Sequence, residues 1–297
     1  MTALVVAHPD DEILWLSSVL ARVDLVVFCF GDIPDEPRAS AGRLAALAEL
    51  SLPRFLSLHL PSAGAFRHVD WDHPVSTEAG IAITNLETRR NYRRNYRILR
   101  RRLDGILKRF STVYTHNPWG EYGHPEHIQI YRVVEALQAE HGYRLGFSGY
   151  IGPRSSGYAR ILAERYAWDE AVRLPTNRRV ARRLRRVYQR HDAWTWIPYH
   201  RWPSYEPLYL RLSADRHRHP SLGGVEVLDI RGLHWWPPPR YRVHRVLAAK
   251  SVDTGLYPGD PGILSPPCSR DSACLEGARW RVAPDVVDNR PVLDSES

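Results

Sequence analysis

The stretch Ala-Leu-Val-Val-Ala-His-Pro-Asp-Asp-Glu, residues 3–12, decides the fold of this chain and points to its chemistry. It begins as a short apolar run typical of a buried strand, and Pro9, which suits the first position of a helix, follows His8. Asp10 and Asp11 then fall in the first helical turn, where the helix dipole favours carboxylates. Adjacent carboxylates point in different directions on a helix, so one can bind a metal beside His8 while the other acts on water. A helix start with acidic residues is the alternative for this run alone.

A second polar cluster, His124-Pro125-Glu126-His127, also follows a short apolar run, residues 112–115. His124 and His127 are three residues apart, so they share one face at the start of a helix. A capped helix with exposed histidines is the alternative. Taken together, the two clusters offer two imidazoles and a carboxylate for one Zn²⁺, which is the ligand inventory of a catalytic zinc site with an open position. Two further groups, Asp10 and His124, remain for acid–base and electrostatic work.

Short apolar runs alternate with helical patterns over the first 150 residues, which predicts an α/β fold with a mostly parallel sheet and helices on both faces. Residues 61–88 are expected to form a long loop, because they contain several prolines and glycines. Both polar clusters fall at strand ends, where such sheets bind ligands. Strands are expected at 3–7, 24–30, 54–60, 112–116 and 145–151, and helices at 12–22, 38–50, 88–109, 125–141 and 175–191.

The length of 297 residues suits one large domain, or a domain with an extension. We expect the domain to span residues 1–200, with an irregular Trp/Pro-rich extension, 201–297, packed on it. The composition, 43% hydrophobic and 25% charged, is typical of a soluble globular protein. No apolar stretch approaches the ~20 residues of a membrane span, and the N-terminus shows no signal-peptide pattern, so we expect a cytoplasmic protein. The oligomeric state is left open.

The net charge of +8 comes mainly from arginine, which favours an acidic substrate or an anionic surface. The helices expected at 88–109 and 175–191 are rich in arginine, and they are either solvated basic faces or a rim for phosphate or an anionic glycolipid. Nucleic acid is not expected, because no RNP motif, zinc finger or helix-turn-helix pattern occurs. Cys29 is expected in the core, whereas Cys268 and Cys274 could pair without forming a disulfide framework.

The two clusters, AHPDDE after the first strand and YGHPEH after a later one, resemble the PIG-L/LmbE-like zinc-dependent N-deacetylases over about residues 1–150. The resemblance implies a Rossmann-like fold and one Zn²⁺ per chain, with Fe²⁺ or Co²⁺ as replacements. It also implies roles for individual residues. The zinc ligands would be His8, Asp11 and His127; Asp10 would be the general base and then acid; a protonated His124 would stabilise the oxyanion, and Tyr122 would polarise the amide carbonyl. One departure is Glu126, where the family usually has Asp.

Substrate contacts are predicted at Arg67, Asp70 and Asp32, the first two from a polar cluster at residues 66–74 and the third from the end of the second strand. The polar cluster could also be a second metal site or a solvated turn. Several tryptophans after residue 190 could stack on sugar rings or pack in the core.

The function expected is removal of the N-acetyl group from an N-acetylglucosamine-type amino sugar in a glycoconjugate, antibiotic or glycolipid precursor. One alternative is a zinc amidohydrolase that removes formyl or a longer acyl group from a non-sugar amine. The other is a non-catalytic glycan-binding protein on the same fold.

Overall fold

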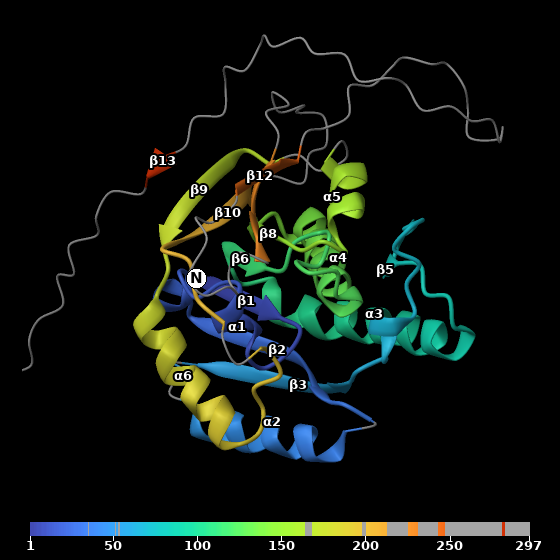
Figure 1. The fold of residues 1–297 in the computed structure, drawn as a ribbon, viewed down its shortest axis with the longest axis horizontal. Helices are drawn as coiled ribbons and strands as arrows, with labels where there is room; N and C mark the ends of the chain where they lie inside the picture. The colour runs from blue at the N-terminus through green and yellow to red at the C-terminus, as the bar shows by residue number, and fades with distance from the viewer. Residues whose placement is uncertain are drawn as a thin grey trace, which may run out of the picture.

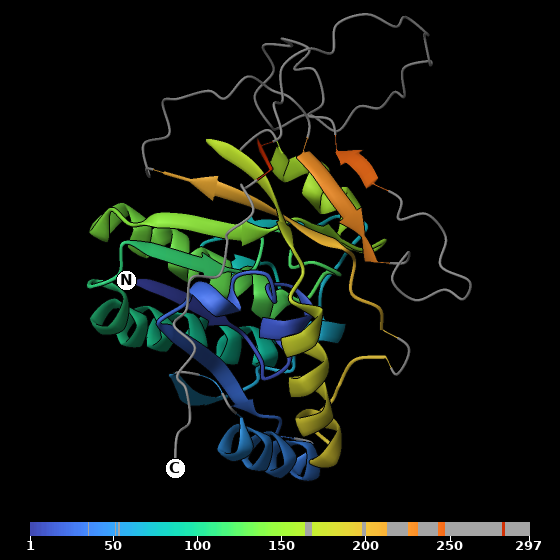
Figure 2. The same ribbon diagram turned by 90° about the vertical axis from the view of Figure 1, so that its left-hand side faces the viewer.

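A mostly parallel β-sheet with helices on both faces forms the centre of the computed structural model (Figures 1 and 2). The structure describes residues 1–34, 36–50, 52, 54–163, 168–197, 200–212, 225–230, 243–246 and 281–282. The longer strands are β1 (Thr2–Val6), β2 (Leu25–Asp32), β3 (Phe55–Pro61), β6 (Thr112–Thr115), β7 (Arg144–Ser148), β9 (Glu170–Pro175), β10 (Tyr205–Arg211), β11 (Val225–Asp229) and β12 (Val243–Val246). The helices are α1 (Asp11–Leu14), α2 (Pro37–Glu49), α3 (Leu86–Leu107), α4 (Pro125–His141), α5 (Ser156–Ala163) and α6 (Arg178–Arg190).

The strand order in the main sheet is β13-β9-β10-β7-β6-β1-β2-β3, where β13 is Arg281–Val282. Strands β7, β6, β1, β2 and β3 are parallel, and β10 is inserted antiparallel between β7 and β9. A smaller sheet joins β12, β11 and β8 (Tyr150–Ile151). The predicted α/β class and parallel sheet are therefore confirmed, and β10 shows that residues after 200 contribute a strand to the same sheet.

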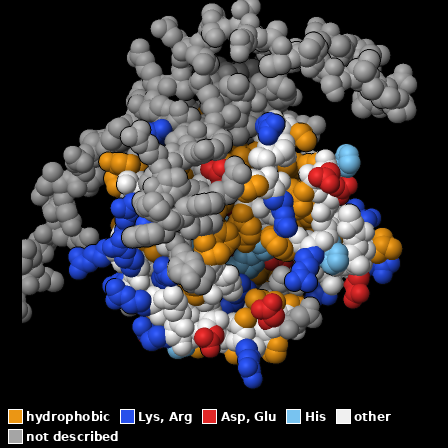
Figure 3. Space-filling model, in the orientation of Figure 1, with side chains coloured by type: hydrophobic (Ala, Val, Ile, Leu, Met, Phe, Trp, Pro, Cys, Tyr) orange, Lys and Arg blue, Asp and Glu red, His pale blue; other side chains and the backbone are white. Residues whose placement is uncertain are grey.

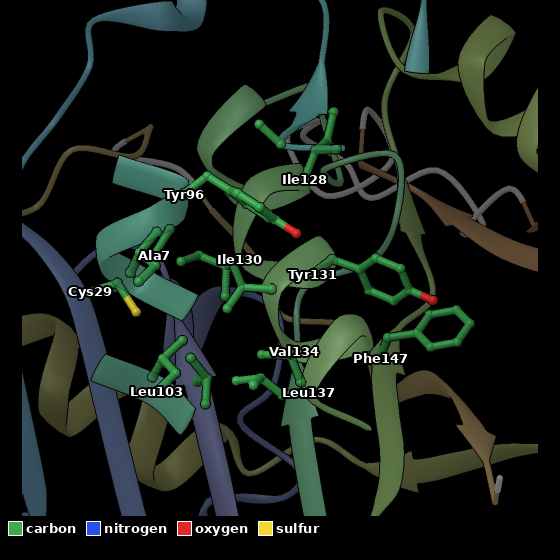
Figure 4. Close-up of a cluster of buried hydrophobic side chains, with 14 of the residues drawn as sticks. Ala7, Cys29, Tyr96, Leu103, Ile128, Ile130, Tyr131, Val134, Leu137 and Phe147 are labelled. Carbon is green, nitrogen blue, oxygen red and sulfur yellow. The ribbon is translucent and has the colours of Figure 1, made fainter. Parts of the chain in front are cut away.

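The residues of β1 alternate between two hydrophobic cores, which is why its sequence is apolar throughout. Ala3 and Val5 face one core with α3 and α4, whereas Leu4 and Val6 face the other with α1, α2 and α6. Figure 4 shows part of the first core, where Cys29 lies as predicted. Burial on both faces fixes β1 in the middle of the sheet, so the residues that follow it are held firmly.

The prediction of a helix over residues 12–22 is wrong in its extent, because α1 ends at Leu14. The cause is a buried carboxylate from β10. The hydroxyl of Ser17 donates to Glu206 Oε1 at 2.5 Å, and the backbone N–H of Ser18 donates to Glu206 Oε2 at 2.9 Å. A backbone N–H that bonds to a distant side chain is lost to the helix ladder, so tertiary contacts override the local pattern here.

The expected loop at 61–88 contains a short 3₁₀ turn, η2 (Ala65–Arg67), and a small hairpin of β4 (Ser76–Thr77) and β5 (Gly80–Ile81). None of the helices in the described ranges is both long enough and apolar enough to span a membrane. The predictions for Cys268, Cys274 and the C-terminal tail lie outside the described residues.

Candidate metal centre

The candidate site lies where the chain leaves β1 and β6, at the edge formed by their carboxyl ends. These two strands are neighbours, and β1 continues to β2 on its other side, so the direction of strand connection reverses between them. Parallel sheets bind ligands in the crevice at such a reversal. The fold therefore brings together the two polar clusters, which are more than 100 residues apart in the sequence.

Three buried side chains, His8, Asp11 and His127, each offer a ligand atom within 4.8 Å of the others. The Asp11 carboxylate lies between the two imidazoles, 3.2 Å from His8 Nδ1 through Oδ2 and 3.3 Å from His127 Nε2 through Oδ1. Burial alone would raise the pKa of Asp11, but the imidazoles of His127 and His116 outweigh it and hold that pKa well below its usual range. The carboxylate is therefore an anion in this setting.

The donor set and its spacing fit a zinc ion. His127 Nε2 is buried, and apart from the 3.3 Å contact with Asp11 Oδ1 it has no hydrogen-bond partner among the described residues, which is costly for a polar atom unless a ligand satisfies it. Two zinc ligands at about 2.0–2.1 Å and a tetrahedral angle lie roughly 3.3 Å apart. The separations of His8 Nδ1 from Asp11 Oδ2 and of His127 Nε2 from Asp11 Oδ1 are close to this value, although they involve different oxygens of the carboxylate. Two nitrogens and one carboxylate are also an established catalytic zinc set.

A second carboxylate orients each of the two histidines. Glu126 Oε2 lies 2.8 Å from His8 Nε2, and Glu121 Oε2 lies 2.8 Å from His127 Nδ1. Each carboxylate thereby fixes one ring nitrogen as the donor and leaves the other nitrogen directed at Asp11. Carboxylate–histidine pairs of this kind orient metal ligands in many metalloproteins. The remaining oxygen of each glutamate accepts hydrogen bonds from the protein. Two further groups, His8 with His124 and Glu126, and His116 with Glu121 and His127, also bring their ligand atoms within 4.8 Å of one another.

Glu121 is the centre of a buried network beneath His127, and sequence reasoning missed it. Its Oε2 also accepts from His116 Nδ1 at 3.2 Å, and the His116 ring stacks on His127 with centroids 3.8 Å apart. The backbone N–H of Ala7 lies 2.9 Å from His116 Nε2, and the same nitrogen lies 3.4 Å from Asp11 Oδ2. Glu121 has a φ of 50°, a left-handed conformation rare outside glycine.

The side chain of Asp10 lies beside this cluster but makes different contacts. Asp10 has a φ of 100°, occupies the N-cap position of the short helix α1 without a side-chain capping bond, and is buried. Burial and the adjacent negative charge of Asp11 raise the pKa of Asp10 to about 7. A carboxyl group with a pKa near neutrality can both accept and return a proton. Strained backbone at Asp10 and Glu121 is also a common property of functional sites.

His124 and Tyr122 stand next to the ligand cluster, as predicted, with His124 at the N-cap of α4. Their rings lie 4.6 Å and 5.5 Å, respectively, from the ring of His127. The backbone N–H of Glu126 donates to His124 Nδ1, which leaves the proton on Nε2. Burial and the neighbouring histidines hold the pKa of His124 well below its usual range, so the structure favours a neutral imidazole over the protonated one expected. Burial likewise raises the pKa of Tyr122 and keeps its hydroxyl protonated.

Arg43, on the inner face of α2, is another residue that sequence reasoning did not single out. It is buried, and its Nε and Nη1 have no hydrogen-bond partner in the described part of the chain. Its charge acts on both His8 and Asp10. A buried guanidinium with unused donors is costly on its own and suggests a ligand with oxygen acceptors. The signal in the sequence is a charged residue on the apolar face of a helix.

The structure does not bring the three predicted substrate residues onto the ligand cluster. Arg67 and Asp70 are exposed on the loop after β3, and Asp32 is exposed at the end of β2. Asp70 accepts from the backbone N–H groups of Asp72 and His73, and its side chain is 51% exposed. These contacts and this exposure show that Asp70 lies in a solvated turn. Within the described residues, none of the three side chains contacts a proposed ligand.

Aromatic side chains surround the opening of the site. Phe66, Tyr122 and Trp196 are each half-buried, and the rings of Tyr122 and Trp196 lie 4.8 Å apart. The ring of Phe66 lies 5.2 Å from that of His124. Figure 3 shows histidine side chains in a hollow bordered by hydrophobic ones, near the end of β1. The approach to the site is therefore apolar at its walls and polar at its base.

No protein-family model matches the chain, and neither does any curated protein. Solved structures do match. A teicoplanin deacetylase in a zinc-inhibited form is 14% identical, with a TM-score of 0.49 over 71% of this chain and 97% of that chain. A deacetylase–teicoplanin complex is 13% identical, with a TM-score of 0.46 over 72% and 100%. The A40926 pseudoaglycone deacetylase is 13% identical, with a TM-score of 0.46 over 74% and 98%. Similarity at this level says nothing of the activity of this chain.

Proposed function

We propose that this chain is a zinc-dependent N-deacetylase, which hydrolyses the N-acetyl group of an amino sugar in a larger glycoconjugate and releases acetate and a free amine. The observation that carries this proposal is the unpartnered, buried His127 Nε2, 3.3 Å from an Asp11 oxygen and beside Asp10. A metal resolves the unsatisfied nitrogen, and the adjacent carboxyl group with a pKa near 7 suits proton transfer.

The ligands in this proposal are His8, Asp11 and His127. An amide is unreactive, and a zinc ion would supply the Lewis acid that polarises its carbonyl and lowers the pKa of water to about 7. Asp10 accepts a proton from the attacking water and returns it to the leaving amine, a transfer typically worth ~10²–10⁴-fold in rate.

In this proposal, His124 and Tyr122 are hydrogen-bond donors to the acetyl oxygen. His124 presents an N–H at Nε2, and Tyr122 presents a hydroxyl whose proton burial retains. Two neutral donors beside the acetyl oxygen would stabilise the negative charge that develops there.

The sugar would be held by the guanidinium of Arg43 and by aromatic side chains at the opening of the site. The free guanidinium donors of Arg43 suit hydroxyl or carboxylate oxygens, and the aromatic walls formed by Tyr122 and Trp196 suit the apolar face of a sugar ring. An anionic substituent on the glycoconjugate fits the arginine-rich composition.

The test is turnover by zinc-loaded protein on a panel of N-acetyl amino sugars, free and glycosidically linked, beside N-formyl and longer N-acyl forms and N-acetylated non-sugar amines. Acid release is followed by proton NMR, and the amine by fluorogenic labelling, with D10A as the control. We expect preferred release of acetate from one or more sugars, lost in D10A. Equal activity in D10A, preference for non-sugar amines, or no turnover on the whole panel would contradict the proposal.

A further inference from the structure

The carboxylate of Asp10 is held by a residue far outside the two motifs. Thr195 donates to Asp10 Oδ2 twice, from its backbone N–H at 3.2 Å and from its hydroxyl at 2.9 Å. No other described residue hydrogen-bonds this carboxylate, and none donates to Oδ1. The two oxygens therefore have different surroundings: one is anchored by the protein, and the other is available to a proton.

The segment that carries Thr195, residues 193–197, is itself anchored at both ends. The backbone N–H of Ala193 donates to the carbonyl of Tyr188 in the last turn of α6, at 2.8 Å. On the other side, the ring of Trp196 packs 4.8 Å from that of Tyr122. Thr195 lies between these two attachments, so its donors are held in a fixed position although the residue itself is solvent-exposed.

Asp10 needs such support more than an ordinary helical carboxylate does. Its backbone has a φ of 100°, and the helix that it caps has four residues. A side chain on such irregular backbone can change rotamer unless a donor restrains it. The two bonds from Thr195 supply that restraint.

We propose that Thr195 is a positioning residue, which anchors Asp10 through Oδ2 so that Oδ1 faces the water and the leaving nitrogen. This inference rests on the proposed function, because it assigns Asp10 as the group that moves the proton. The site would then depend on two separate parts of the chain. The motifs supply the proposed ligands and Asp10, and the segment after α6 sets the orientation of Asp10.

The test compares T195V with T195S. Valine keeps the shape and the backbone N–H but removes the hydroxyl, and a hydrogen bond to a charged group is worth roughly ten- to a hundred-fold. We expect kcat to fall by roughly that factor, with KM and zinc content unchanged, and serine to restore most of it. A matched control is T176V, because Thr176 Oγ1 is buried and has no hydrogen-bond partner among the residues that the structure describes, so its loss should leave kcat unchanged.

The same substitution in the D10A background separates positioning from general damage. T195V should add no further loss to D10A, since the group that it positions is gone. Wild-type kcat in T195V, a loss confined to KM, or an equal further loss in the D10A background would overturn the inference and leave the proposed function standing.

A stability measurement tests the contact even if no substrate is turned over. In a thermal-unfolding cycle of wild type, T195V, D10A and the double variant, the Tm shifts of the two single variants should not add. Additive shifts would show that Thr195 and Asp10 do not interact and would overturn the inference, whereas inactivity of the wild type on every substrate would count against the proposed function alone.

Discussion

Different parts of the chain support the two sides of this site. We call them the ligand side, formed by His8, Asp11 and His127, and the Asp10 side. Glu126 and Glu121, both within or next to the second motif, orient His8 and His127. Asp10, by contrast, is held by Thr195 after α6, and its backbone N–H bonds to Glu12. Metal binding and proton transfer should therefore respond to different substitutions, although Asp10 and Asp11 are neighbours in the sequence.

The most disruptive change to the ligand side is D11A. Asp11 lies between the two histidines and also accepts from the backbone N–H of His8 at 2.7 Å. We expect loss of detectable turnover and of the rise in Tm that added zinc gives the wild type, because a ligand that binds only the folded state stabilises it. Differential scanning calorimetry with and without zinc measures this.

The control for D11A is D104A, which alters a solvent-exposed cluster of Asp104, Glu140 and His141 on α3 and α4. This variant should keep the full zinc response. If D104A lost the response and D11A kept it, zinc would bind at the surface of the protein and not at the end of β1.

On the other side, D10A should separate chemistry from metal binding. We expect it to keep the zinc response, since Asp10 is not among the proposed ligands, and to lose ~10²–10⁴-fold in kcat, the usual contribution of a positioned acid–base group. Steady-state kinetics and calorimetry on the same preparation measure both quantities. Loss of zinc in this variant would reassign Asp10 as a ligand and remove the distinction between the two sides.

A smaller effect on the ligand side is expected from E121Q and E126Q. Each replaces a carboxylate that orients a histidine with an amide of the same shape, which weakens the bond and makes the ligand less basic. Zinc affinity, measured by competition with a chelator, should fall roughly ten- to a hundred-fold. Unchanged affinity in both variants would mean that the two glutamates serve only to fill the core.

The smallest effect should come from Y188F, on the Asp10 side. The hydroxyl of Tyr188 donates to Glu12 Oε1 at 2.6 Å, and Glu12 Oε2 accepts from the backbone N–H of Asp10 at 3.0 Å. Removing one neutral donor two steps from the reaction should lower kcat roughly two- to tenfold. Zinc affinity should stay constant, and a fall in affinity without a change in kcat would place Tyr188 on the ligand side instead.

Much of the parallel sheet could be predicted, because strands that are buried on both faces have near-continuous apolar sequences, as in residues 3–7 and 24–30. The grouping of His8, Asp11 and His127 was predictable for a related reason: parallel strands end at one edge, so polar residues after two neighbouring strands must meet.

The remaining features depend on contacts between distant segments, which leave no local pattern. Helix α1 is short because Glu206 bonds to Ser17 and Ser18, almost 190 residues earlier. Thr195 lies 185 residues from the carboxylate that it holds. Glu121 lies in a turn with a positive φ, and its bonds to His127 and His116 depend on a backbone conformation that the sequence did not indicate.

The most direct test of the account is the zinc content of the purified protein, measured by elemental mass spectrometry on wild type, D10A and H127A prepared together. The account predicts about one zinc per chain in wild type and in D10A, and none in H127A, because His127 Nε2 is the buried nitrogen that a metal would satisfy. Absence of metal from wild type after zinc loading, or full occupancy in H127A, would contradict the proposed metal centre and the function built on it.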